Sequence, residues 1–358
     1  MKLKQIYLVN TVTIFIIIFI TGCNRQGNIP LEHIPIYLKE IITESNSFDD
    51  IFKEEKRIQF QTPDTVFLGD ITNIYINNDG DIAIIDRVNQ IPLLFDSTGN
   101  FQRMIGRRGA GPGEFQSAVS ICYNENEKIW FVADNNLRRL SAFNINGEFL
   151  YSFSTDSFVL RMRVNKEGIL YLYRPNEMEK GMLLSLDSKG NTIANFIDQP
   201  PIRRQMPWFS MIGGGFSLLD DGIVAAHYMS SSLEYYSFSG KKINSFDLNK
   251  INGFIEGKPL KIELGLDEFM GSFTGIFSVL SLSYDIILIT YGISSTSQRE
   301  PKIFFAFLDK NGNVLKSGVE TKHGFDFYDT LGRTYTIKYP ESDEYDPFLV
   351  RWKINREK

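Results

Sequence analysis

Short apolar segments separated by glycine, asparagine and aspartate fill the chain from about residue 56 onward. Residues 82–85 and 129–133 are typical, because each is a continuous apolar run followed directly by an aspartate. No sustained helical periodicity interrupts this pattern after residue 56. Short strands bounded by turn residues are typical of sheet proteins. We therefore predict an all-β fold.

A tight-turn signature that contains glycine recurs along the chain. It occurs at residues 95–101, 143–149, 186–191, 238–241 and 308–313. The glycine in each turn supplies the positive φ that a hairpin turn demands. A second punctuated apolar strand precedes each turn, and a sixth such strand lies at 332–337. The repeats average about fifty residues, which is in the range of four-stranded propeller blades.

These repeats predict a six-bladed β-propeller of four-stranded antiparallel blades. The blades are expected to begin near Ile71, Ala118, Phe158, Trp208, Gly271 and Lys322. The C-terminal part of the sequence supplies only three strands of the sixth blade, the third at 348–354. Residues 57–68 are therefore expected to supply its outer strand. Closure of the last blade by an N-terminal strand removes the open edge between the first and last blades.

The first 22 residues have the pattern of a signal peptide. Lys2 and Lys4 precede an apolar stretch at 6–20, which is shorter than the roughly twenty residues that a membrane-spanning helix needs. The stretch ends in Ile20-Thr21-Gly22-Cys23, which resembles a bacterial lipobox. Cys23 is therefore the predicted lipidation site, with acyl chains of the palmitate type. The alternative is an ordinary secretory signal with a coincidental cysteine.

Three segments follow from these observations. Residues 1–22 are predicted to be a lipoprotein signal peptide, 23–55 a lipid-anchored tether with a short helix around 36–42, and 56–358 the propeller. Residues 24–28 lack an acidic cluster, which favours an outer-membrane anchor facing the periplasm.

The charge balance bears on the partners. There are 38 basic and 43 acidic side chains, a formal net charge of -5, which argues against a nucleic-acid partner because no basic excess neutralises phosphates. The expected partners are the membrane, through the N-terminal lipid, and an unidentified protein, peptide or glycan. We expect a monomer.

One blade junction carries a family resemblance. Residues 101–115, with the Gly111-Pro112-Gly113-Glu114-Phe115 run and the turn that precedes them, resemble the junction of NHL-type repeats. Together with the lipobox, the chain resembles the six-bladed β-propeller lipoproteins of Gram-negative bacteria over residues 56–354, with the sharpest match in the first two blades. Proteins of this family mostly have no established activity, so the resemblance implies a fold more than a function.

The lengths of the connections indicate where a site would lie. The first-to-second and third-to-fourth connections of each blade share one face, and these are tight. The long loops at 107–115, 198–208, 249–271, 294–301 and 339–346 therefore share the opposite face. Loops on a rigid scaffold are where binding residues concentrate, so we predict a binding site on this long-loop face. Its candidate residues are Asp86, Arg87, Arg107, Arg108, Asp134, Arg174, Trp208, His227 and Tyr291.

Guanidinium and indole groups suit carboxylates or sugar rings, although solvated loop charges are the alternative for each candidate. The loop 106–115 is tempting as an anion nest, but a strand follows it and GxxxxGK[ST] is not matched, so we interpret it as a blade crossover. The turns at 96–100 and 309–313 resemble calcium loops but lack the later glutamate. Cys122 lies in an apolar strand and is predicted to be buried and inert. The sequence predicts no catalytic residue and no cofactor, and it leaves a metal undetermined.

We therefore predict a membrane-anchored binding or scaffold module that recognises its ligand through the long-loop face without chemistry. The alternative is a propeller hydrolase, lactonase or lyase in which a metal in the central channel polarises the substrate. Such an enzyme needs inward-pointing Glu, Asp, Asn or His from several blades, and no convergent set is obvious. A sensory or assembly partner of a transport or glycan-use system differs from the first hypothesis only in its partner.

Overall fold

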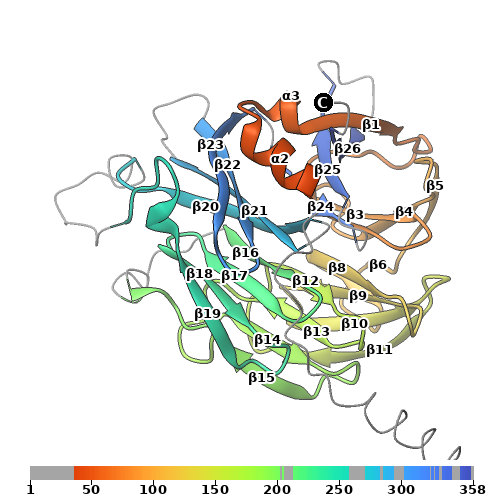
Figure 1. Cartoon of the computed structure of the whole chain (residues 1–358). Coiled ribbons are helices and arrows are strands. Elements are labelled where there is room, and N and C mark those ends of the chain that lie inside the picture. The colour runs from red at the N-terminus through yellow and green to blue at the C-terminus, as the bar shows by residue number, and fades with distance from the viewer. Residues whose placement is uncertain are drawn as a thin grey trace, which may run out of the picture. The chain divides into compact units, whose positions relative to one another are not determined.

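The structure is a computed structural model that describes residues 36–201, 204, 213–257, 271–282, 285–293, 302–322, 324–325, 327–329, 333–340 and 347–355 (Figure 1). The chain divides into two units, 1–33 and 34–358, and only the second contains described residues. The predicted signal peptide, Cys23 and Trp208 lie outside the described residues. No described helix is long and apolar enough to cross a membrane.

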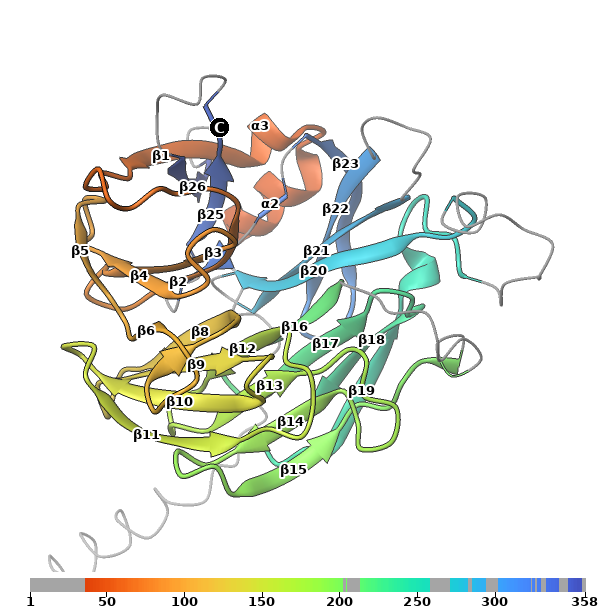
Figure 2. The same cartoon turned by 180° about the vertical axis from the view of Figure 1, so that it is seen from behind.

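Six sheets of four antiparallel strands form the described part of the second unit, and Figure 2 shows them arranged around a central axis. The prediction of an all-β, six-bladed propeller is confirmed. Blade 1 contains β2 (Ile71–Ile76), β3 (Ile82–Asp86), β4 (Pro92–Phe95) and β5 (Phe101–Met104). Blade 2 contains β8 (Ala118–Asn124), β9 (Ile129–Asp134), β10 (Arg139–Asn144) and β11 (Phe149–Ser154). Blade 3 contains β12 (Arg161–Val164), β13 (Leu170–Tyr173), β14 (Leu183–Leu186) and β15 (Thr192–Phe196).

The other three blades repeat this order. Blade 4 contains β16 (Gly214–Leu218), β17 (Ile223–His227), β18 (Ser232–Tyr236) and β19 (Lys242–Asp247). Blade 5 contains β20 (Gly275–Leu282), β21 (Ile286–Ile293), β22 (Lys302–Asp309) and β23 (Val314–Thr321). Blade 6 contains β24 (Phe327–Tyr328), β25 (Thr334–Lys338), β26 (Phe348–Ile354) and the N-terminal β1 (Phe52–Gln59). A short parallel pair, β6 (Arg107–Arg108) and β7 (Glu114–Phe115), and a 3₁₀ turn, η1 (Leu248–Lys250), lie between blades or beside them.

The core lies between the faces of neighbouring blades. The middle strands β3, β4 and β13 are buried along their whole length, whereas the outer strand β5 is mostly exposed. Continuous apolar runs in the sequence therefore correspond to strands that are covered on both faces. This packing makes the inner strands a rigid frame around the axis.

The N-terminal strand closes the ring, as predicted. β1 pairs antiparallel with β26, from Phe52 opposite Ile354 to Gln59 opposite Phe348. The strand begins and ends earlier than the expected 57–68, because the buried Phe52 packs edge-on against Phe325 at a ring distance of 4.9 Å. Gly99, in the adjacent turn of blade 1, has a φ of +94°, and a Cβ there would clash with the backbone O of Gln59. Only glycine fits this approach of the turn to β1.

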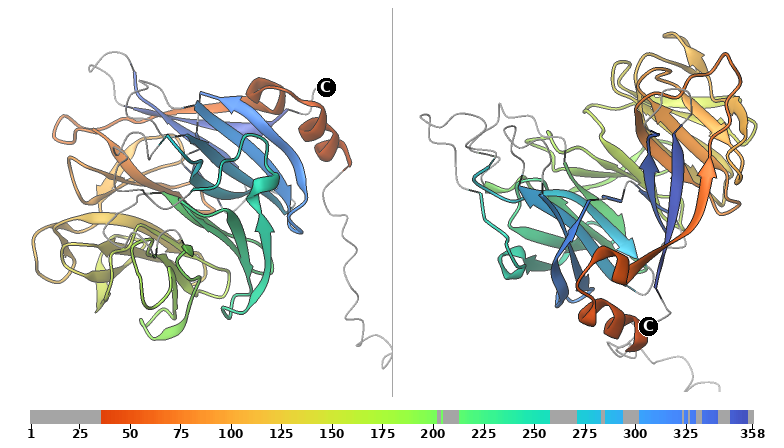
Figure 3. Two further views of the ribbon diagram at one scale, coloured as in Figure 1. Left: turned by 90° about the vertical axis from the view of Figure 1, so that its left-hand side faces the viewer. Right: turned by 90° about the horizontal axis from the view of Figure 1, so that it is seen from above.

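Two short helices precede β1 in the described part of the chain, and Figure 3 shows them beside the outer strands of blades 5 and 6. They are α2 (Ile36–Glu44) and α3 (Phe48–Ile51), of which α2 is the helix expected at 36–42. Leu38 and Ile42 are buried in the apolar cluster that contains Phe305 and Phe307. A capping box between Ser47 and Asp50 begins α3. Residues 36–55 are therefore part of the packed body, which begins ahead of the boundary expected at residue 56.

Candidate functional site

The second strands of blades 1 and 2 end in buried aspartates, Asp86 and Asp134, which are each 1% exposed. The carboxylate of Asp134 accepts hydrogen bonds from the backbone N of Gln116 (2.7 Å) and of Leu137 (2.8 Å). Asp86 accepts the equivalent bond from Asn89 N at 2.6 Å. Both carboxylates therefore hold the turn that follows their strand, and the Asp134 carboxylate also holds the crossover that arrives from blade 1.

Arg174 occupies the corresponding position in blade 3 and is also 1% exposed. Its Nη1 donates to Asp156 Oδ1 at 3.2 Å and to Ser157 Oγ at 3.1 Å. Its Nη2 donates to Gly181 O at 3.0 Å and to Asn195 Oδ1 at 2.7 Å. These bonds fix the crossover from blade 2 to the loop and outer strand of blade 3.

His227 and Tyr291 end or nearly end the second strands of blades 4 and 5, and both are 1% exposed. His227 Nδ1 accepts from Met229 N at 3.1 Å, and its side chain lines a cavity of about 630 Å³ between blades 3 and 4. Tyr291 donates its hydroxyl proton to Asn252 O at 2.9 Å. Burial raises the pKa of Tyr291 to about 12, so its hydroxyl stays protonated at neutral pH.

The remaining candidates are exposed. Arg87 forms an ion pair with Asp70 at 3.0 Å, and Arg107 forms one with Glu114 at 2.7 Å. Arg108 donates to Gln90 Oε1 at 2.8 Å. The described candidates thus lie apart, at the ends of different blades, and each has a partner within the protein.

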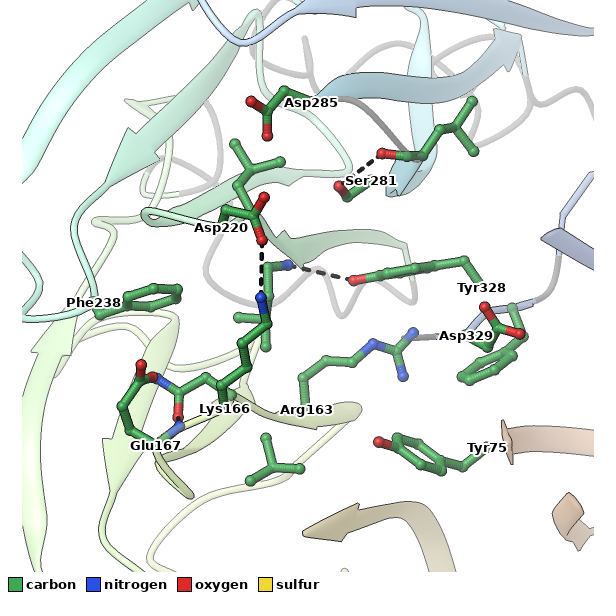
Figure 4. A pocket seen from close by; sticks show the side chains of 16 residues that line it. Tyr75, Arg163, Lys166, Glu167, Asp220, Phe238, Ser281, Asp285, Tyr328 and Asp329 are labelled. Carbon is green, nitrogen blue, oxygen red and sulfur yellow. Dashed lines mark hydrogen bonds and ion pairs between the residues drawn. The ribbon is translucent and has the colours of Figure 1, made fainter. Parts of the chain in front are cut away.

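A different set of residues converges on the opposite, tight-turn face. A cavity of about 310 Å³ opens there at the end of the central channel, and we call it the channel pocket (Figure 4). The first strands of five blades contribute to its wall. The lining includes Tyr75 of blade 1, Arg163 of blade 3, Leu218 of blade 4, Ser281 of blade 5 and Tyr328 of blade 6.

Hydrogen bonds hold the wall of the channel pocket rigid. Ser217 Oγ donates to Tyr328 Oη at 2.6 Å, which joins blade 4 to blade 6 across the channel. Tyr75 donates its hydroxyl proton to Tyr123 O at 3.2 Å. Burial raises the pKa of Tyr75 well above its usual range, so its hydroxyl remains a neutral donor. The pocket is therefore preformed.

Four carboxylates surround the pocket, and three of them form ion pairs. Asp220 pairs with Lys166 at 3.1 Å, and Asp285 pairs with Lys310 at 3.2 Å. Asp329 pairs with Arg333 at 2.6 Å and also accepts from Tyr335 Oη. The fourth is Glu167, in the turn between β12 and β13. Ion pairing makes the three paired carboxylates poorer ligands for a metal, and the described residues contain no group of three or more His, Cys, Asp or Glu placed to hold one.

A second cavity of about 320 Å³ lies at the other end of the channel, and Arg163 lines both. Cys122, on the innermost strand of blade 2, is fully buried, and burial raises its pKa to about 12. The thiol is therefore protonated at neutral pH, and its burial agrees with the prediction. The sequence pattern does not distinguish Arg163, because Arg161-Met162-Arg163-Val164 is typical of an ordinary half-buried strand. Convergence of first strands from separate blades is the signal that would have found it.

A family model described as Domain of unknown function (DUF4934) matches residues 33–345. The chain belongs to this family. No curated protein matches the chain. The six-bladed propeller of this chain agrees with the fold that the sequence resemblance implied. The NHL-like character of the blade junctions and the lipoprotein assignment stay predictions.

Several solved structures share the fold. One is a protein from Bacteroides fragilis NCTC 9343 whose name describes it as exported; it is 14% identical, with a TM-score of 0.60 over 86% of this chain and 97% of its own. A member of the DUF4221 family from Bacteroides vulgatus ATCC 8482 is also 14% identical, with a TM-score of 0.61 over 85% and 98%. Kuenenia stuttgartiensis hydrazine synthase is 11% identical, with a TM-score of 0.51 over 77% and 76%. At these identities the likeness concerns the fold alone.

Proposed function

We propose that this DUF4934 propeller is a binding module that holds a small molecule in the channel pocket. The observation that carries the proposal is the convergence of five blades on one preformed cavity of about 310 Å³. Small-molecule sites are mostly preformed concavities of roughly this size or larger, with aromatic walls and a few polar groups. Tyr75, Phe238, Phe327 and Tyr328 provide the aromatic wall here. The proposed ligand site thereby moves from the long-loop face to the tight-turn face.

The same proposal places the module in the cell envelope. The lipobox at 20–23 supports export followed by lipidation of Cys23, and the exported protein from Bacteroides fragilis with the same fold is consistent with export. The packed body begins at about residue 36, so a short tether after Cys23 would hold the propeller close to the membrane. We propose an outer-membrane anchor facing the periplasm.

Binding in the channel pocket is tested by blocking the pocket. Ser281 lies in the wall on β20, and a Ser281→Trp substitution would fill much of the cavity. Thr192→Trp on the exposed outer strand β15 is the matched control. The full chain in detergent would be melted with benzoate, benzamide, glucuronate, glucose and phenylethylamine. We expect at least one compound to raise the Tm of the wild type and of Thr192→Trp but not of Ser281→Trp, because a ligand that binds the native state stabilises it.

Equal shifts in both tryptophan variants would contradict this site. A shift in none of the three proteins with any of the five compounds would also contradict the proposal at the millimolar concentrations used.

The anchor is tested separately. A Cys23→Ser variant cannot be acylated, so we expect it to leave the membrane fraction of expressing cells and appear in the soluble fraction. Stable anchoring needs more than one acyl chain, and all of the acyl chains attach at this residue in a lipoprotein. Persistence of Cys23→Ser in the washed membrane fraction would refute the lipid anchor.

A further inference from the structure

Arg163 projects from β12 into the channel pocket, where two aromatic rings hold its guanidinium. Figure 4 shows Arg163 near Tyr328. The Cζ atom lies 5.2 Å from the ring centroid of Phe327 and 5.0 Å from that of Tyr328. Both rings come from blade 6, on the other side of the channel from blade 3. Because Ser217 fixes the hydroxyl of Tyr328, the guanidinium is held in one place before any ligand arrives.

The hydrogen-bonding capacity of this guanidinium is almost unused. Its single bond within the described structure runs from Nη1 to Met162 O at 3.4 Å, which is long. Nε is buried without a hydrogen-bond partner. No described carboxylate forms an ion pair with Arg163. Partly buried charges are normally paired, since removing an unpaired charge from water is costly. Two aromatic faces provide only part of that compensation.

Inside the channel pocket, Arg163 carries a positive charge that no described carboxylate balances. Asp220, Asp285 and Asp329 are each neutralised by a cation, as described above. The remaining charges of the wall are Arg163 inside and Glu167 at the exposed rim. A dianion such as phosphate would meet four carboxylates with a single unpaired cation to receive it. A monoanion is matched by Arg163 alone.

We propose that the channel pocket binds a small organic monocarboxylate, whose carboxylate is received by the guanidinium of Arg163. This inference rests on the proposed binding function and names the ligand class for the same site. The planar guanidinium matches the two oxygens of a carboxylate and binds it with charge-assisted hydrogen bonds. The body of the ligand packs against Tyr75, Phe238 and Leu218.

The proposal is tested with matched pairs of acids and neutral analogues. The full chain in detergent is titrated by calorimetry with acetate, benzoate, hippurate and glucuronate, and with acetamide, benzamide, hippuramide and glucose. We expect at least one acid to bind with a Kd at least about tenfold below that of its neutral partner. Arg163→Gln is expected to abolish this difference. Lys189→Gln removes an exposed cation from a hairpin turn of the same blade and is expected to preserve it.

Each other outcome overturns the inference. It fails if no acid binds more tightly than its neutral partner, if Arg163→Gln keeps the preference, or if no acid binds. Inorganic phosphate is included as a separate arm, and tighter binding of phosphate than of every carboxylate also overturns it. Binding of a neutral compound that Ser281→Trp blocks would leave the proposed binding function standing while the carboxylate class falls.

Discussion

Blade 3 carries two arginines in opposite circumstances. Arg174 is buried at the long-loop end of β13, and its four hydrogen bonds reach a carboxylate, a hydroxyl, an amide oxygen and a backbone carbonyl. Arg163 lies in the channel beside the rings of Phe327 and Tyr328 and has one long hydrogen bond. The same residue type therefore joins segments of the protein in one place and presents an unused charge in the other.

The contrast extends to the two faces of the propeller. At the long-loop face, equivalent positions of successive blades are occupied by Asp86, Asp134 and Arg174. Each of these side chains forms hydrogen bonds with neighbouring segments of the protein. At the tight-turn face, the residues around the channel pocket leave one guanidinium without a counterion. A polar residue at a strand end is thus a poor guide to function until its partners are known.

The largest expected effect comes from replacing the two arginines in turn. Arg174→Met leaves Gly181 O and Asn195 Oδ1 without their donor in a partly buried setting, and it removes one of the two cations that pair with Asp156. We expect a loss of about 2–3 kcal/mol in the free energy of unfolding. Arg163→Met removes one weak hydrogen bond and two contacts with aromatic rings, but it also removes an unpaired charge that is costly to bury, so we expect a net change of less than about 1 kcal/mol. Chemical denaturation of both variants at neutral pH measures the difference.

Arg174→Lys sharpens the comparison, because an ammonium keeps the charge but lacks the planar fork that reaches several acceptors. We expect it to recover only part of the loss. If Arg163→Met destabilised the protein as much as Arg174→Met, Arg163 would be a structural residue and the contrast would be false.

The fold could be predicted from the sequence because its signals are local. Glycines such as Gly99 and Gly147 have positive φ in the turns where the pattern required them, and apolar runs such as 82–85 became buried strands. The residue at which the packed body begins was harder to predict from the sequence. Leu38, Ile42 and Phe48 are spaced among polar residues, and they pack on blade 5 and blade 6 residues from the far end of the chain.

The channel pocket could not be predicted for the same reason. Arg163 acquires its character from Phe327 and Tyr328, which belong to another blade, and no local pattern connects them. Arg174 was selected because it is a polar residue at the end of an apolar strand. Its partners Asp156 and Asn195 lie on other elements, so no local pattern indicates that its hydrogen bonds are already made within the protein.

Acid unfolding provides a smaller and finer test of the same contrast. Asp156 accepts from Lys180 Nζ at 2.6 Å and from Arg174 at 3.2 Å, and the hydrogen bond from Lys180, followed by the one from Ser157 and the charge of Arg174, lowers the pKa of Asp156. The folded protein then holds the aspartate proton less tightly than the unfolded chain does. The stabilisation is complete above the unfolded value of about 3.9 and is lost as the pH falls below it.

Asp156→Asn should therefore lose stability at neutral pH, by about 1 kcal/mol or less because this side chain is half exposed. Its Tm should fall less steeply than that of the wild type between about pH 5 and pH 3, since it has no proton to take up at this position. Arg163→Met should follow the wild-type profile, because no described carboxylate depends on Arg163 for its charge partner. A steeper fall of Tm with pH in Asp156→Asn, or a shallower one in Arg163→Met, would contradict the assignment of a structural role to Arg174 and of an unpaired charge to Arg163.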